Sequence, residues 1–259
     1  MFSSYAAIGD SFTEGMGDDL PDGTVRGWAD FVAIGLSHAA IASGGGPIGY
    51  ANFAIRGRKL SPLLAEQLAP AIALKPALLS LNGGGNDIMR PKVLISDVAA
   101  QLVQAARRAT DAGIHVLLLS GANPANHLPM GSTMQRRGDE LAAAVTALLP
   151  LENVTFVDNW NDAELGKIEY WSNDKLHLNT LGHARVASNV LNGLGVAVPS
   201  EWGIDEASVS RASSRNSFGY YRDHVVPWIG RRLTGRSSGD GRLPKRATLQ
   251  PVVIEGAAS

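Results

Sequence analysis

The distribution of apolar residues along this 259-residue chain constrains its fold more than any other feature. Short apolar runs alternate with longer segments in which apolar residues recur every three or four positions. The short runs are typical of buried strands, and the longer spacing predicts amphipathic helices. Strands are expected at 5–8, 50–55, 77–81, 115–119 and 154–157. Helices are expected at 27–42, 60–74, 92–112, 132–149 and 179–192.

This alternation predicts an α/β fold with a mostly parallel sheet and helices on both of its faces. In such sheets the reactive groups gather beyond the carboxyl ends of the strands. Ser11, Gly57, Asn86 and the loop 121–130 all follow expected strands. We therefore expect them to meet at one edge of the domain.

The end of the chain differs from the rest in composition. Residues 1–200 carry 14 Lys and Arg against 18 Asp and Glu, whereas residues 201–259 carry nine against six. Aromatic and aliphatic residues at 218–229 predict a short amphipathic helix, and the polar, glycine-rich stretch 231–242 is typical of a flexible basic tail. We expect a domain at 1–198 and an extension at 199–259.

The overall composition bears on partners and location. The formal net charge of −1 gives no reason to expect a nucleic acid or a membrane surface as partner. The chain has no cysteine, which excludes thiol chemistry and is easiest in a reducing compartment. No segment approaches the roughly 20 consecutive apolar residues that span a bilayer. These features predict a cytoplasmic protein; they do not indicate its oligomeric state.

Two distant segments carry the parts of a nucleophilic hydrolase. Gly9-Asp10-Ser11 follows the first expected strand, where a turn can expose a hydroxyl, and Asp174 precedes His177 by three residues. A serine hydroxyl is a poor nucleophile that needs an adjacent base, and the base needs a group to hold its other ring nitrogen. We therefore assign Ser11 as nucleophile, His177 as base and Asp174 as the acid that orients it.

Acyl transfer also needs hydrogen-bond donors directed at the developing oxyanion. Three candidates follow three different strands. Ser11 has its own backbone N–H, Gly57 has no Cβ and so lets its backbone approach a ligand, and Asn86 can donate from its side-chain amide. We expect these three residues to form an oxyanion hole.

Together these stretches resemble the SGNH (GDSL-like) hydrolase superfamily, in its serine esterase and lipase branch. The resemblance is carried, in the order of the family, by Gly9-Asp10-Ser11, by 52–57, by Gly84-Gly85-Asn86-Asp87 and by 174–177. It implies a three-layer α/β/α, flavodoxin-like domain with a five-stranded parallel sheet. It also implies hydrolysis of carboxylic esters through an acyl-enzyme, with no metal and no cofactor.

The substrate is expected to be a small ester with a short acyl or acetyl group on a polar alcohol. The loops expected at the pocket mix apolar and polar residues, whereas a long acyl channel would need more apolar loops. The residues expected to contact the substrate are Asp10, Met89, Asn126, Met130 and Trp171. The alternative is that Trp171 and Met130 are ordinary core or rim residues.

Three other interpretations of the site stay open. The same residues could serve an acyltransferase, or the pocket could belong to a non-catalytic binding module. A metal-dependent phosphoesterase could use oxygen-rich ligands drawn from Asp10, Asp87, Asp174 and His177. His183, six residues beyond His177, is expected to be a packing or surface histidine rather than a second base.

Overall fold

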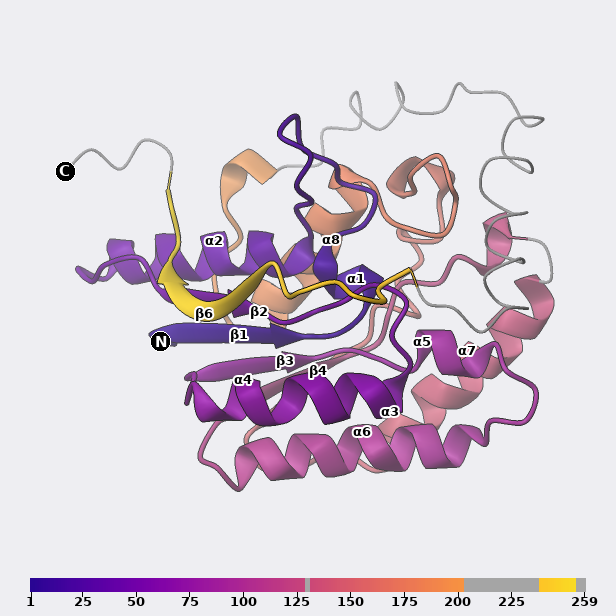
Figure 1. The fold of residues 1–259 in the computed structure, drawn as a ribbon. Helices are drawn as coiled ribbons and strands as arrows, with labels where there is room; N and C mark the ends of the chain where they lie inside the picture. Colours follow the sequence, from indigo (N-terminus) through magenta and orange to yellow (C-terminus); the bar gives the residue numbers. More distant parts are fainter. Residues whose placement is uncertain (129–130, 203–237, 255–259) are drawn as a thin grey trace.

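The computed structural model describes residues 1–128, 131–202 and 238–254, and its centre is a six-stranded sheet in the order β5-β4-β3-β1-β2-β6 (Figure 1). The strands are β1 (Ser4–Ile8), β2 (Gly49–Asn52), β3 (Leu78–Leu81), β4 (His115–Leu119), β5 (Val154–Val157) and β6 (Arg246–Pro251). The first five are parallel, as predicted. Their order is that of flavodoxin-like sheets, in which ligands bind beyond the carboxyl ends of the strands.

Helices cover both faces of this sheet (Figure 1), so the predicted three-layer α/β/α arrangement is confirmed. The alternation of side chains along β1 serves both layers: Tyr5 and Ala7 enter one core, and Ala6 and Ile8 the other. One face packs on α2 (Trp28–Ala42) and α8 (Thr180–Gly193); the other packs on α3 (Leu60–Leu63), α4 (Ala69–Ala73), α6 (Ile95–Thr110) and α7 (Gly131–Thr146).

The five predicted helical segments are present, with ends that differ from expectation by no more than three residues. The segment expected at 60–74 is interrupted by the π-helical turn η1 (Leu64–Leu68). Two helices, α1 (Ser11–Glu14) and α5 (Gly85–Ile88), were not predicted. They are four residues long, which is too short to show a helical period, and both contain predicted site residues.

Short 3₁₀ turns complete the described elements: η2 (Ala125–His127), η3 (Ile168–Tyr170) and η4 (Ser200–Trp202). Within the three described ranges, no helix is both long and apolar enough to cross a membrane.

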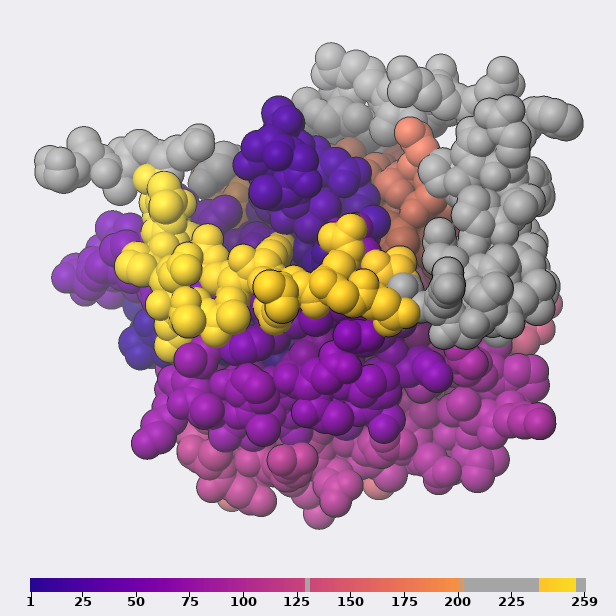
Figure 2. Space-filling view, in the orientation of Figure 1, coloured from indigo at the N-terminus to yellow at the C-terminus, as the bar shows by residue number. Residues whose placement is uncertain are grey.

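The prediction of a five-stranded parallel sheet misses one strand. Within the extension expected at 199–259, β6 pairs antiparallel with β2, and the Val252 N–H donates to the Ile48 carbonyl at 3.0 Å. Figure 2 shows residues 238–254, in yellow, lying against the surface of the N-terminal part of the chain. The side chains of β6 are mostly exposed, so this edge strand has no apolar pattern that could be detected in the sequence.

This finding also bears on the expected division at residue 198. The end of the extension completes the sheet of the domain instead of lying outside it. The predicted helix at 218–229 lies outside the described residues, and so does most of the predicted basic tail, up to residue 237.

Candidate active site

The loops that follow β1, β2 and β3 meet at the carboxyl edge of the sheet, as predicted. One side chain joins all three: the Asn86 amide donates to Asp10 Oδ2 at 3.0 Å and to the Arg58 carbonyl at 3.0 Å. Asp10 follows β1, Arg58 lies beyond β2, and Asn86 belongs to α5 after β3. The predicted nucleophile and oxyanion residues therefore share one edge of the domain.

The turn that presents Ser11 depends on Gly9. A Cβ at Gly9 would lie 2.2 Å from Thr13 Oγ1, which is closer than any side chain permits. Asp10 then caps α1 by accepting the Phe12 N–H at 3.1 Å on Oδ1. Ser11 is the first residue of this single helical turn, which ends at Gly15 in the left-handed region (φ +105°). The strand thus turns abruptly at Ser11 and leaves its side chain partly exposed.

Sequence reasoning missed Gln67, which holds this turn from the opposite side. Its side-chain oxygen accepts the Gly9 N–H at 2.9 Å, and its side-chain nitrogen donates to the Gly9 carbonyl at 3.0 Å. Gln67 is 1% exposed and lies in η1. π-Helical turns are often found at functional sites, where the extra residue redirects a side chain. The signal in the sequence was its spacing: Gln67 lies four residues after Leu63 and four before Ala71, so a polar residue falls on the apolar face of the helix.

Asp10 occupies an unusual electrostatic position. Burial raises its pKa from 3.8 to about 6, although the hydrogen bond from the Phe12 N–H and the charge of His177 act in the opposite direction. Its two oxygens accept from the Phe12 N–H and the Asn86 amide. Asp10, expected among the substrate-contacting residues, is therefore buried and occupied with the turn and with Asn86.

Asp174 and His177 form a tight pair in the loop before α8. His177 Nδ1 lies 2.6 Å from Asp174 Oδ2, while Asp174 Oδ1 accepts from the Ser172 hydroxyl and from the backbone N–H groups of Leu176 and His177 at 2.8–2.9 Å. Burial by itself would raise the pKa of Asp174, but these bonds and the His177 charge lower it well below its ordinary value. A permanently ionised Asp174 fixes which nitrogen of His177 carries the proton.

The His177 loop packs on the segment that follows α1. A Cβ at Gly17 would lie 2.1 Å from the Leu178 carbonyl oxygen and 3.2 Å from His177 Cβ, so glycine allows this approach. Among the described residues, the Ser11 hydroxyl makes no hydrogen bond to the His177 ring. In free enzymes such bonds are often long and tighten only when substrate is bound.

His183 also connects these two regions. It is fully buried, accepts the Trp28 N–H on Nδ1 at 3.1 Å, and lies 3.1 Å from the Met16 carbonyl through Nε2. Burial lowers its pKa to about 4, so the ring is neutral at pH 7. The expectation of a packing histidine is confirmed for His183.

The residues expected to contact the substrate do not form one group. Trp171 is 6% exposed and its indole N–H donates to the Leu165 carbonyl at 2.7 Å, so it belongs to the core rather than to an open pocket wall. Met89 packs on a small cluster around Trp160. Asn126 is exposed on η2. Met130 lies outside the described residues.

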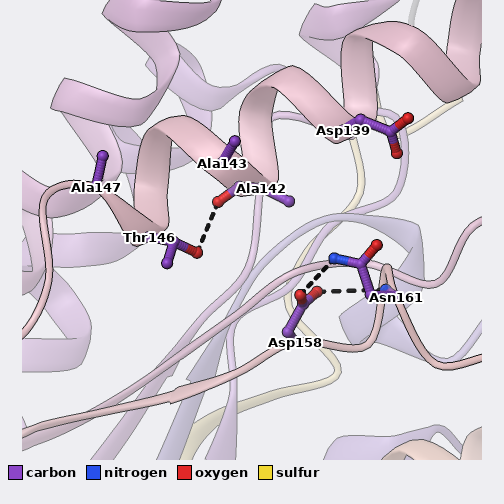
Figure 3. Close-up of a pocket in the computed structure, with 7 residues that line it drawn as sticks. All are labelled: Asp139, Ala142, Ala143, Thr146, Ala147, Asp158 and Asn161. Carbon is purple, nitrogen blue, oxygen red and sulfur yellow. Dashed lines mark hydrogen bonds between the residues drawn. The ribbon is translucent and has the colours of Figure 1, made fainter.

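A surface cavity elsewhere contains none of the predicted site residues. It lies between α7 and the segment after β5 (Figure 3), and is lined by Asp139, Ala142, Ala143, Thr146, Ala147, Asp158 and Asn161. In the part of the chain that the structure describes, no group of three or more acidic or histidine side chains is arranged to hold a metal ion.

Comparison with protein families agrees with this geometry. Residues 7–185 match the profile of the GDSL-like lipase/acylhydrolase family. This range runs from the end of β1 into the first half of α8 and includes every predicted catalytic residue. The chain belongs to the GDSL-like lipase/acylhydrolase family. As a member of this family it is an esterase of the SGNH type.

Solved structures similar to this esterase share its fold. A lipase from a goat rumen metagenome has a TM-score of 0.61 at 18% identity, covering 76% of this chain and 99% of its own. The acetylxylan esterase of Geobacillus stearothermophilus has a TM-score of 0.57 at 23% identity, covering 76% and 97%. An α/β hydrolase from a Lake Arreo metagenome has a TM-score of 0.57 at 19% identity, covering 74% and 95%. No curated protein matches the sequence.

Proposed function

We propose that this esterase cleaves short-chain carboxylic esters through an acyl-enzyme on Ser11, with His177 as general base and Asp174 as its orienting acid. The observation that carries the proposal is the 2.6 Å contact between His177 Nδ1 and Asp174 Oδ2, at the sheet edge where Ser11 is presented. An ionised carboxylate on Nδ1 leaves Nε2 free to accept a proton.

The reaction takes place in two similar halves. Ser11 Oγ attacks the ester carbonyl while His177 takes its proton, and the imidazolium then protonates the leaving alcohol. Water, deprotonated by His177, next attacks the acyl-Ser11 ester and releases the acid. Asp174 stays ionised throughout and stabilises the imidazolium in each half.

The backbone supports an oxyanion hole at Ser11 and Gly57. Neither N–H donates a hydrogen bond to another described residue, so both are free to bind an oxyanion. Gly57 has a φ of +72°, a conformation that glycine adopts without strain. The Asn86 amide is already bonded to Asp10 and to the Arg58 carbonyl, so the oxyanion would share or replace one of these acceptors.

The preference for short acyl groups is supported by one structural neighbour. The acetylxylan esterase of Geobacillus stearothermophilus has been solved with catalytic mutations that replace a serine or an aspartate by alanine. The site proposed here also contains a serine, Ser11, and an aspartate, Asp174, and the substrate named for that neighbour carries acetyl groups. A small ester, such as an acetylated sugar, is therefore the substrate class that we propose. The cytoplasmic location stays a prediction from the sequence.

The test is hydrolysis of p-nitrophenyl esters from acetyl to octanoyl by the wild type, Ser11→Ala, and the surface control Ser43→Ala. We expect Ser11→Ala to lose at least roughly 10³-fold in kcat. The wild type and Ser43→Ala should retain activity, be fastest on the shorter chains and be insensitive to EDTA. Activity that persists in Ser11→Ala, or that EDTA abolishes, would show that the serine mechanism is wrong.

A further inference from the structure

Residues 55–58 carry two parts of the proposed oxyanion hole. Gly57 offers its backbone N–H, and the Arg58 carbonyl accepts one of the two hydrogen bonds of the Asn86 amide. We call residues 55–58 the oxyanion loop. Its position relative to Ser11 decides whether the three donors converge, and a displacement of about 1 Å can cost on the order of 100-fold in rate.

Residues 238–245, here called the C-terminal strap, pack directly on this loop. A Cβ at Gly239 would lie 2.2 Å from the Arg56 carbonyl oxygen and 2.6 Å from Ile55 Cγ2. Asp240 adds an ion pair with Arg58 at 3.2 Å. The strap therefore contacts the oxyanion loop through its backbone, at a distance that only glycine permits, and through a charge.

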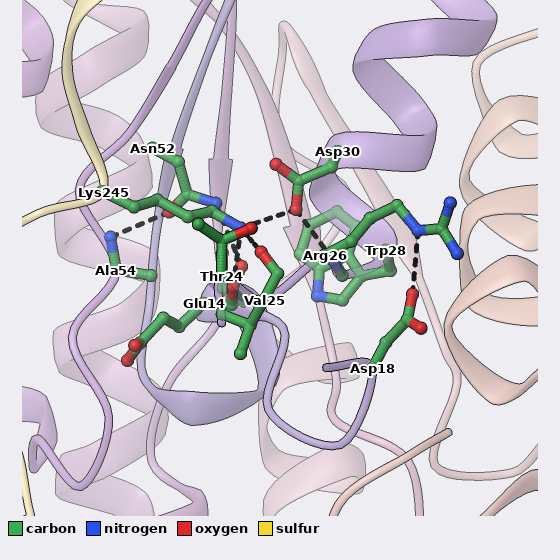
Figure 4. Close-up of polar contacts among 12 residues, drawn as sticks. Glu14, Asp18, Thr24, Val25, Arg26, Trp28, Asp30, Asn52, Ala54 and Lys245 are labelled. Carbon is green, nitrogen blue, oxygen red and sulfur yellow. Dashed lines mark hydrogen bonds and ion pairs between the residues drawn. The ribbon is translucent and has the colours of Figure 1, made fainter. Parts of the chain in front are cut away.

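The strap is anchored on the nucleophile side by Lys245. Its ammonium group donates to the Glu14 carbonyl at 2.6 Å, to the Val25 carbonyl at 3.1 Å and to Asp30 at 2.6 Å (Figure 4). An ammonium group has three N–H donors, and each has an acceptor here. Lys245 thus connects the end of α1, the segment after it and the start of α2.

Helix α1, which carries Ser11, is tied to the oxyanion loop by a buried ion pair between Glu14 and Arg56. Glu14 accepts the Arg56 backbone N–H at 2.6 Å and also binds its guanidinium group through Nε at 2.8 Å. Glu14 is 7% exposed, and a buried charge of this kind is strongly destabilising when its partner is removed. The turn of Ser11 and the oxyanion loop are therefore one connected unit, and the strap closes it from outside.

We propose that the C-terminal strap positions the oxyanion loop, so that Gly239, Asp240 and Lys245 are positioning residues for catalysis. The proposal rests on the oxyanion hole proposed above. The strap lies beyond the region 7–185 that matches the family profile, so this device belongs to the extension rather than to the shared domain. It acts through its contacts with the oxyanion loop, by holding in place the Gly57 N–H and the Arg58 carbonyl that accepts from Asn86.

The experiment compares kcat and KM for p-nitrophenyl acetate in Gly239→Ala, Asp240→Ala and Leu243→Ala. Leu243 is 88% exposed within the strap and serves as the matched control. We expect kcat to fall about tenfold in Gly239→Ala and about threefold in Asp240→Ala, with KM within about twofold and Leu243→Ala unchanged. Asp240 is largely exposed, so its variant keeps the test available if Gly239→Ala does not fold.

A double-mutant cycle separates positioning from general loss of stability. In an Asn86→Ala background, part of the machinery that the strap positions is gone, so the tenfold effect of Gly239→Ala should shrink to about threefold or less. The same factor in both backgrounds, or a lowered Tm with unchanged kcat, would overturn the role of the strap. Ser11→Ala is assayed in parallel: if it stays active, the proposed function fails, whereas an inactive Ser11→Ala beside a fully active Gly239→Ala refutes only the strap.

Discussion

The carboxylate that orients the base is hydrogen-bonded by residues of its own loop, whereas the turn that carries the nucleophile is held by distant segments. Asp174 bonds to Ser172, Leu176 and His177, all within three positions of it. Gly9, beside the nucleophile, is bound by Gln67 from 58 positions away. One half of the site is a local structure, and the other is a product of tertiary packing.

This difference predicts how substitutions will behave. In the local half, a change of chemistry can remove activity while the fold stays intact, because few other contacts depend on the loop. In the nucleophile half, the contacts that position the turn also contribute to the core, so activity and stability should change together. The three predictions below test this contrast in order of decreasing effect on rate.

The largest effect is expected in the local half, from Asp174→Asn. The amide can still accept the backbone N–H groups, but it presents a donor to His177 and favours the wrong tautomer. We expect kcat to fall by roughly 10³–10⁴-fold and Tm to change by only a few degrees. Steady-state kinetics and calorimetry on one preparation check both. A large loss of stability would show that this half is not local.

In the nucleophile half, Gln67→Leu should lower both activity and stability. The substitution leaves the Gly9 N–H buried without a partner, at a cost of about 1–3 kcal/mol. It also removes one of the two donors to the Gly9 carbonyl, which keeps the Ile55 N–H at 3.2 Å. We expect kcat to fall roughly 10- to 100-fold. Urea unfolding and ester hydrolysis measure the two effects. Gln101→Leu, on the surface of α6, is the control; if Gln67→Leu resembles it in both assays, the contrast between the halves is lost.

The smallest change in rate is expected from Asp10→Asn. Unlike Gln67→Leu, this substitution should raise the free energy of unfolding. The wild-type carboxyl has a pKa of about 6 in the folded protein against 3.8 as its ordinary value, so ionisation costs the native state. Its contribution to stability is complete below pH 3.8 and is lost as pH rises to about 6, by on the order of 3 kcal/mol. The amide introduced by Asp10→Asn does not titrate, so the variant should gain stability relative to the wild type across this window.

The same variant should lose roughly tenfold in kcat, because its amide nitrogen faces the Asn86 amide and can no longer accept from it. Urea unfolding at several pH values between 4 and 7 measures the stability difference. Asp22→Asn is the control: hydrogen bonds from Thr24 lower the pKa of this exposed residue, so its titration lies below pH 3.8 and its substitution should give a stability difference that does not change between pH 4 and 7. A pH-independent difference for Asp10→Asn would contradict the raised pKa.

The sequence by itself determined the framework of the domain. Five strands and five helical segments were predictable because each has its own local pattern of apolar residues: a short run in a strand, or a recurrence every three or four positions in a helix. The parallel sheet follows from the alternation of strands and helices. The Asp174 and His177 pair was predictable for a related reason: a spacing of three residues can be closed within one loop.

Only the tertiary structure decided how the nucleophile half is built. Gln67 is a polar residue on the apolar face of its helix, β6 is mostly exposed, and Lys245 lies 231 positions from Glu14, so none of them shows its partner in the local pattern. Trp171 could have been a pocket residue or a core residue, and packing decided for the core. The physical reason is the same in each case. Contacts between distant segments depend on how the helices and the sheet pack together, and the spacing of apolar residues along the sequence does not specify that packing.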